Sequence, residues 1–208
     1  MEGNLHEKLF FINGFFIPSV FADTTELTDI TAPLGLNWGE NASELIKDNE
    51  ASQVYESGRM KVYALKNTPI KLPGFDTEVI VDDKYGLVKV ILSKDVSDDM
   101  TGAEGLNIYK EYKKVLSEKY GKPVSYEYIG RKLYTESDEF YQCLRYQGCG
   151  SYVSFYSPIK GSDAGISVSL QGIKRGNGNL NIVYESMGFV KYRDEQKQAE
   201  KLDMQKGL

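Results

Sequence analysis

The 208-residue chain contains a single histidine, His6, and only two cysteines. His6 lies in the N-terminal segment, residues 1–22, that we predict to be cleaved after Ala22, so the mature chain would have no histidine. A Ser-His-Asp triad or a Cys-His pair needs histidine as its general base. The sequence therefore excludes these common hydrolase mechanisms, and also zinc or haem held by histidine.

Patterns for nucleotide and nucleic-acid binding are also missing. The chain has no Gly-x-x-x-x-Gly-Lys-Ser/Thr phosphate loop, and Gly176-Asn177-Gly178 lies in a predicted hairpin turn rather than between a strand and a helix. Lysine and arginine never form a run longer than two residues, and the formal charge is -5. Polyanion binding requires clustered positive charge. We therefore expect no nucleic-acid partner and no cofactor.

What the N-terminus does contain is typical of a secretory signal peptide over residues 1–22. The apolar run at residues 9–17 is too short to span a bilayer, and Pro18 breaks it. Val20 and Ala22 are small residues that suit the -3 and -1 positions of a cleavage site. We therefore expect a periplasmic or secreted protein.

The remaining residues, 23–208, are expected to form a single domain, because about 186 residues is an ordinary size for one hydrophobic core. No second apolar run approaches the ~20 residues that cross a membrane, so the mature chain should have no membrane span. An alternative interpretation of the N-terminus remains, because residues 1–8 are nearly neutral where a signal peptide is usually positive. In that case residues 9–21 would be a buried strand or helix of the folded domain.

The two cysteines, Cys143 and Cys149, are separated by five residues. In an exported chain we predict that they form a local structural disulfide, which would contribute about 2.5 kcal/mol by restricting the unfolded chain. The alternative is a functional thiol pair. A redox or metal-binding function would favour Cys-x-x-Cys spacing, which the chain lacks.

Hydrophobic periodicity predicts an α+β fold. The predicted helices cover residues 42–47, 102–120, 135–146 and 190–202, and the predicted strands cover residues 60–65, 77–81, 87–92, 124–128, 152–156, 166–173 and 180–184. Asn41 and Glu44 have the spacing of a capping box for the first helix. Tight turns between strands indicate a mostly antiparallel sheet with helices packed on one face. The element order also fits two pseudo-repeated halves, each with a helix, three strands and a second helix, that meet near Val124. A coincidence of element order is the alternative.

No metal site or catalytic residue is predicted. Residues 95–100 resemble the start of a calcium loop, but Met100 stands where the sharp turn needs glycine and Leu106 where a bidentate glutamate is needed. We interpret this segment as a polar turn that caps the following helix. Many carboxylates remain that could act as a glycosidase-like pair, and nothing in the sequence selects two of them.

Tyrosine is the most distinctive residue type, since ten of the fifteen lie between Tyr109 and Tyr156. Tyrosine combines an apolar ring with a hydrogen-bonding hydroxyl, which favours recognition of proteins or sugars. We expect helical tyrosines to pack in the core, namely Tyr109, Tyr112 and Tyr120. Two strand stripes are the candidate binding residues, either of which could instead face the core: Tyr126 with Tyr128, and Tyr152 with Tyr156.

Several short motifs give the chain a family resemblance. They are Leu34-Gly35-Leu36-Asn37-Trp38-Gly39, Lys119-Tyr120-Gly121-Lys122-Pro123, Cys143-Leu144 with Gly148-Cys149-Gly150, and Tyr184-Glu185-Ser186. In these motifs the chain resembles a group of small uncharacterised exported bacterial proteins. The resemblance implies export and an α+β fold, and it implies no activity and no site residue.

Export, the missing catalytic chemistry and the tyrosines predict a non-enzymatic binding, inhibitor or accessory protein. Its expected partner is another protein in the cell envelope or outside the cell. The alternative prediction is a carbohydrate-active enzyme or sugar-binding protein that uses carboxylates and tyrosines.

Overall fold

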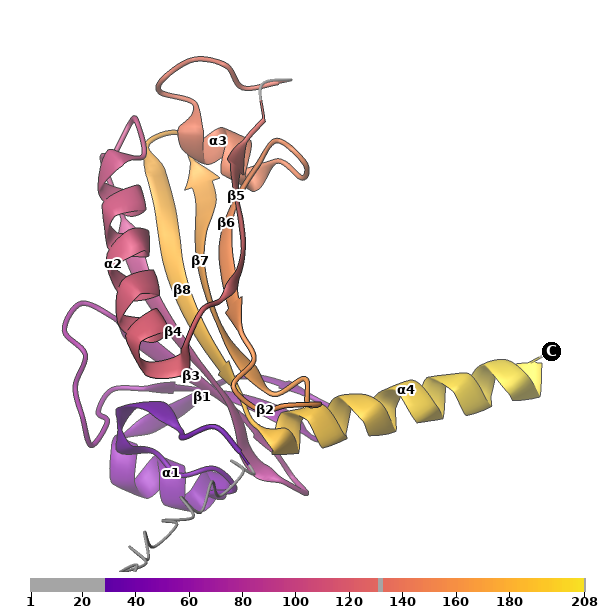
Figure 1. Cartoon of the computed structure of the whole chain (residues 1–208). Helices are drawn as coiled ribbons and strands as arrows, with labels where there is room; N and C mark the ends of the chain where they lie inside the picture. Colours follow the sequence, from indigo (N-terminus) through magenta and orange to yellow (C-terminus); the bar gives the residue numbers. More distant parts are fainter. Residues whose placement is uncertain (1–28, 131–132, 208) are drawn as a thin grey trace, which may run out of the picture.

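The computed structural model describes residues 29–130 and 133–207, which form one eight-stranded antiparallel sheet with four α-helices (Figure 1). The strand order is β1-β2-β3-β4-β8-β7-β6-β5. The strands are β1 (Ala51–Ser57), β2 (Met60–Leu65), β3 (Asp76–Asp82), β4 (Gly86–Val96), β5 (Val124–Ile129), β6 (Gly150–Tyr156), β7 (Gly165–Lys174) and β8 (Asn177–Glu185). The helices are the 3-10 turn η1 (Pro33–Gly35), α1 (Ala42–Asn49), α2 (Ala103–Tyr120), α3 (Phe140–Arg145) and α4 (Met187–Gly207). The predicted α+β class is confirmed.

One face of the sheet, called the covered face below, carries the core. Residues directly opposite one another in antiparallel strands point to the same face. One such row crosses six strands, and every member is at most 8% exposed: Tyr63, Val79, Val90, Tyr184, Ile166 and Tyr156. Buried residues Tyr109 and Leu116 of α2 and Leu45 of α1 join this core. The helices are therefore held on the sheet by apolar burial.

The opposite face, called the open face, has a different row of side chains. Across five strands it presents Ser93, Asn181, Ser169, Val153 and Tyr126. These residues are small, polar or aromatic, and the row includes Tyr126, which is 55% exposed. The two faces thus follow from the period-2 alternation along each strand.

The predicted caps form at the starts of α1 and α2. The Asn41 side chain accepts a hydrogen bond from the Glu44 backbone N–H at 3.0 Å, and the Glu44 carboxylate accepts one from the Asn41 N–H at 3.2 Å. At α2, the Asp99 carboxylate accepts hydrogen bonds from the Gly105 N–H at 2.9 Å and the Tyr141 hydroxyl at 2.8 Å. The interpretation of residues 95–100 as a helix-capping turn is therefore confirmed.

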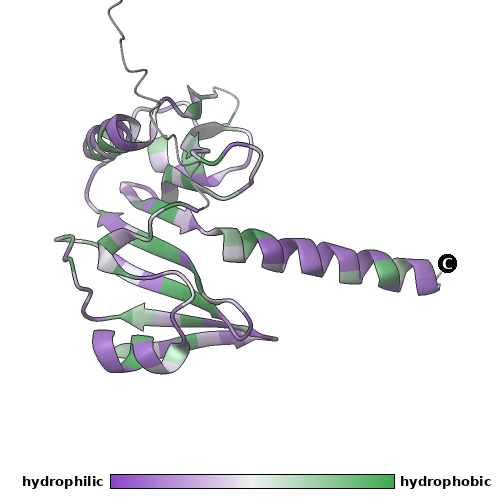
Figure 2. Cartoon of the chain, turned by 60° about the horizontal axis from the view of Figure 1, so that its bottom comes forward, coloured by the Kyte–Doolittle hydropathy of each residue, from purple (hydrophilic) through white to green (hydrophobic). Residues whose placement is uncertain are grey.

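The C-terminal helix α4 is the exception to the packing on the covered face. Its first turns lie on the open face, where the Lys89 Nζ is 4.8 Å from the centre of the Phe189 ring. Glu195 fixes its direction by accepting hydrogen bonds from Arg59 at 2.6 Å and from the Tyr85 hydroxyl at 2.6 Å. Residues 196–207 are exposed throughout and project away from the sheet (Figure 1). This part of α4 is mostly hydrophilic (Figure 2).

Three sequence expectations differ from the structure. The sequence did not predict strand β1, because its residues are almost all exposed and lack apolar alternation. The helix predicted over residues 135–146 begins only at Phe140, because the N–H groups of Thr135 and Glu136 donate to the Glu139 carboxylate in a preceding turn. Each half of the sheet has four strands rather than the predicted three. The pseudo-repeat of the two halves stays a prediction.

Candidate binding surface

The outermost strand β5 carries the most exposed group of apolar side chains on the open face. Val124 is 62% exposed, Tyr126 55% and Tyr128 46%, and Phe155 on the neighbouring strand β6 is 46% exposed. The Tyr126 and Phe155 rings meet edge to face with 6.4 Å between their centres. We call these four residues the aromatic patch. Exposed aromatic side chains in one contiguous group are typical of recognition surfaces.

The four tyrosines predicted as binding residues separate into two pairs. Tyr126 and Tyr128 lie on the open face, as an exposed surface requires. Tyr152 and Tyr156 lie on the covered face, where Tyr156 is 2% exposed and donates a hydrogen bond to the Lys113 carbonyl at 2.7 Å. The expectation of exposure is therefore wrong for Tyr156, because α2 packs over the inner strand β6.

Tyr152 is half-buried, with its ring 5.8 Å from the centre of the Tyr109 ring. Phe155, which is not among the four predicted binding residues, occupies the open face of β6. Alternation places residue 155 on the opposite face from Tyr156, so Phe155 could be identified only once the burial of Tyr156 was known.

A shallow hollow with a volume of about 510 Å³ lies beside the aromatic patch on the open face. Its lining combines apolar side chains with hydroxyl and amide groups, including Ile91, Val183, Phe155, Ser167, Ser169 and Asn181. The lining contains no aspartate, glutamate, histidine or lysine. The hollow thus offers groups for binding but no carboxylate pair for acid-base catalysis.

A hydrogen-bond network on the covered face holds β5 in position behind the patch. The Tyr109 hydroxyl contacts the Glu127 carboxylate at 2.8 Å and the Ser154 hydroxyl at 2.7 Å, and Ser125 bonds to the same Ser154 oxygen at 2.7 Å. Lys113 of α2 also donates to Glu127. Two neighbouring elements, β6 and α2, therefore fix this edge strand.

The charges of this network are set by their surroundings. Burial raises the pKa of the Tyr109 hydroxyl, and the nearby Glu127 carboxylate raises this pKa further. Tyr109 therefore stays a neutral hydrogen-bond donor. Partial burial also works to raise the pKa of Glu127, but hydrogen bonds from Lys113 and Tyr109 outweigh it and leave that pKa below its ordinary value. Glu127 is therefore ionised at neutral pH.

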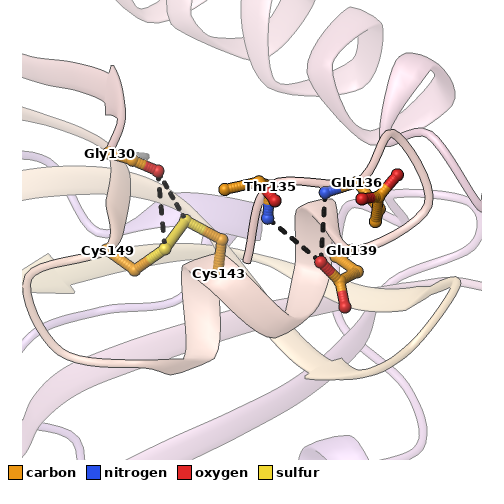
Figure 3. Close-up of a disulfide and its surroundings, with 6 residues drawn as sticks. All are labelled: Gly130, Thr135, Glu136, Glu139, Cys143 and Cys149. Atoms are coloured by element: carbon orange, nitrogen blue, oxygen red, sulfur yellow. Dashed lines mark hydrogen bonds between the residues drawn. A yellow bond between two sulfur atoms is a disulfide. The ribbon is translucent and has the colours of Figure 1, made fainter. Parts of the chain in front are cut away.

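The disulfide lies at the C-terminal end of β5. Cys143 of α3 is bonded to Cys149, which confirms the predicted pairing, and both sulfur atoms lie 3.6 Å from the Gly130 carbonyl oxygen (Figure 3). The Gly130 N–H donates to the Cys149 carbonyl. The same helix, α3, also packs closely on β8, because Gly178 leaves room for the Tyr141 ring. The disulfide thus joins α3, the start of β6 and the end of β5.

Residues 1–22, the predicted signal peptide, lie outside the described residues. Within the part of the chain that the structure describes, no group of three histidine, cysteine, aspartate or glutamate residues could hold a metal ion. None of the helices described is long and apolar enough to cross a membrane.

No protein-family model, curated protein or solved structure matches the chain. The resemblance to small exported bacterial proteins therefore stays an expectation.

Proposed function

We propose that this is an exported, non-enzymatic protein that binds another protein of the cell envelope or the exterior through its aromatic patch. The observation that carries the proposal is the exposure of Tyr126, Tyr128 and Phe155 together on a sheet whose strand β5 is fixed from behind. Aromatic side chains on rigid strands lose little conformational entropy on binding, so their buried area contributes efficiently to affinity.

The disulfide supports the exported location. Disulfides persist in the periplasm and outside the cell, whereas cytosolic thiols are kept reduced. The bond between Cys143 and Cys149 and the signal-like residues 1–22 both agree with export to such a compartment.

Site-specific crosslinking tests the proposal. A photoreactive benzoylphenylalanine at position 128 should give a discrete adduct with a different protein in cells that export the chain. The matched control places the same group at Tyr55, which is 62% exposed on the opposite edge strand β1. The proposal also requires that F155A weaken the adduct from position 128. Equal adducts from both positions, or no adduct with another protein from position 128, would contradict it.

A sugar-binding function is the second candidate, favoured by the hydroxyl and amide groups of Ser167, Ser169 and Asn181 beside the Phe155 ring. Sugars are bound by such combinations of polar groups and aromatic rings. Titration with a panel of oligosaccharides would support it if one binds and N181A removes the binding. Binding unaffected by N181A, or no binding at all, would reject it.

A further inference from the structure

Among the described residues no strand pairs with the outer edge of β5, and this edge has a defined set of backbone donors and acceptors. The Gly130 N–H donates to Cys149 on the β6 side, and β5 pairs with β6 without a register shift. Hydrogen-bonded pairs alternate along an antiparallel ladder, so residues 124, 126 and 128 also direct their backbone groups toward β6. The N–H and C=O groups of Ser125, Glu127 and Ile129 therefore face away from the sheet.

The two edges of the sheet differ in how they are protected. Strand β1 has a register irregularity between Gln53 and Tyr55, and such bulges hinder further strand pairing. Strand β5 is regular, contains no proline or lysine, and exposes all six of its residues. A regular, exposed edge rich in valine, tyrosine and isoleucine is a template for another strand.

We propose that a second copy of this chain occupies this edge, with the two β5 strands antiparallel about a two-fold axis at Tyr126. Such an interface is isologous, so each copy supplies the same surface. The proposal goes beyond the proposed function, because edge-to-edge pairing uses the backbone groups of β5 and leaves the side chains of the aromatic patch on the open face.

Charge and backbone chemistry select the register. Centring the axis on Glu127 would place two ionised carboxylates directly opposite each other, which is destabilising. Centring it on Ser125 would place Glu127 opposite Pro123, which has no N–H to donate, and would leave a single complete hydrogen-bonded pair. Centring it on Tyr126 places Pro123 opposite Ile129, at the end of the strand, and leaves two complete pairs. Centring it on Tyr128 would bring the second strand to the end of β5 where residues 134–137 lie beside Ile129 and Gly130.

With the axis at Tyr126, each Glu127 faces Ser125 of the other copy in a hydrogen-bonded pair. The outward backbone groups of both residues are then satisfied in each copy. The two Tyr126 side chains meet on the open face, and Val124 faces Tyr128 of the other copy. The aromatic patches of the two copies therefore merge into one surface, which removes exposed apolar area from water.

Cysteine crosslinking of the purified protein tests both the partner and the register. Residues of a non-hydrogen-bonded pair have Cα atoms about 4.5 Å apart, within the range that a disulfide spans. Mild oxidation of Y126C, with the Cys143–Cys149 bond retained, should therefore give a covalent dimer that reductant reverses. The variants V124C and Y128C should crosslink when mixed and remain mostly monomeric alone. The control Y55C on β1 should remain monomeric.

Sedimentation of the unmodified protein provides the second readout. The wild-type chain should show a concentration-dependent equilibrium between monomer and dimer. Y126K should raise the dissociation constant at least about tenfold, because two ammonium groups would face each other across the axis. Y55K should leave the equilibrium unchanged, and circular dichroism would check that each variant is folded.

Three results would overturn the inference. They are a wild-type protein that stays monomeric at every accessible concentration, crosslinking of Y55C as efficient as that of Y126C, and a dimer that Y126K does not weaken. Because these experiments contain only the purified chain, their failure leaves the crosslinking test of the proposed function unaffected. An adduct of twice the chain mass from position 128 in cells would support the second copy, and an adduct of another mass the foreign partner.

Discussion

The covered and open faces of this sheet are built from the same strands, one residue apart, yet they differ in every property that bears on function. On β8 the covered face presents Ile182, which is 2% exposed, and the open face presents Val183 beside the hollow. The covered face is held by apolar burial under α2. On the open face, α4 lies at one end of the sheet, where ionic contacts anchor it through Glu195.

Tyrosine shows most clearly what this difference teaches. Tyr126 with Tyr128 and Tyr152 with Tyr156 are both same-face stripes, and their side chains are chemically identical. One pair is exposed and the other packs beneath α2, so the helix decides whether a tyrosine stabilises the fold or is free to bind. The exposure of a tyrosine on this sheet therefore depends on the face it occupies.

The largest expected effect separates the two faces by substitution on β8. I182A should lower the free energy of unfolding by about 3 kcal/mol, because it opens a cavity in the packed core. V183A should lower it by about 1 kcal/mol or less, since Val183 faces the hollow. Denaturant unfolding of both variants measures the difference. Equal losses would contradict the division into covered and open faces.

A smaller loss is expected when the disulfide at the end of β5 is reduced. Opening the Cys143–Cys149 bond frees a short loop of the unfolded chain, which should lower stability by about 1 to 3 kcal/mol while the sheet persists. Thermal unfolding with and without reductant, followed by circular dichroism, measures it. Complete loss of the sheet on reduction would show that the covered-face core is not sufficient by itself.

The third effect concerns two tyrosine hydroxyls, one on each face. Y109F should lower stability by about 1 kcal/mol, because Glu127 and Ser154 lose their shared partner in a partly buried network. Y126F should change stability by less than about 0.5 kcal/mol, since its ring is exposed. Denaturant unfolding compares the two. A greater loss for Y126F would mean that the hydroxyl on the open face is structural.

Local signals in the sequence were sufficient for most of the fold. Asn41 and Glu44 predicted the start of α1, and apolar periodicity together with Gly121 and Pro123 predicted α2 and its end. Strand β1 escaped detection because an edge strand with both faces exposed needs no apolar alternation. The order of the strands in the sheet depends on long-range pairing, as between β4 and β8, which no local pattern encodes.

The candidate site was only half predictable for a related reason. Alternation placed Tyr126 with Tyr128 and Tyr152 with Tyr156 correctly on common faces of their strands. It could not say which face α2 would cover, because that depends on contacts such as the one between Tyr156 and Lys113, 43 residues apart in the chain. Phe155 was overlooked for the same reason, since its exposure is the consequence of Tyr156 being buried.

The smallest expected effect concerns the ionic anchor of α4 on the open face. Hydrogen bonds from Lys84, Tyr85 and Arg59 lower the pKa of Glu195 to about 2. Since the ordinary pKa in the unfolded chain is 4.5, this contact stabilises the fold above that pH, and the stabilisation is lost as the pH falls from about 4.5 toward 2. E195Q should therefore show a weaker loss of stability over this range than the wild type, and the two should converge at the acid end. High salt should reduce the difference in stability between E195Q and the wild type at neutral pH. It should leave the stability lost in I182A, on the covered face, unchanged. Thermal unfolding across pH and salt measures both, and an identical pH dependence of E195Q and wild type would mean that the anchor is not ionic.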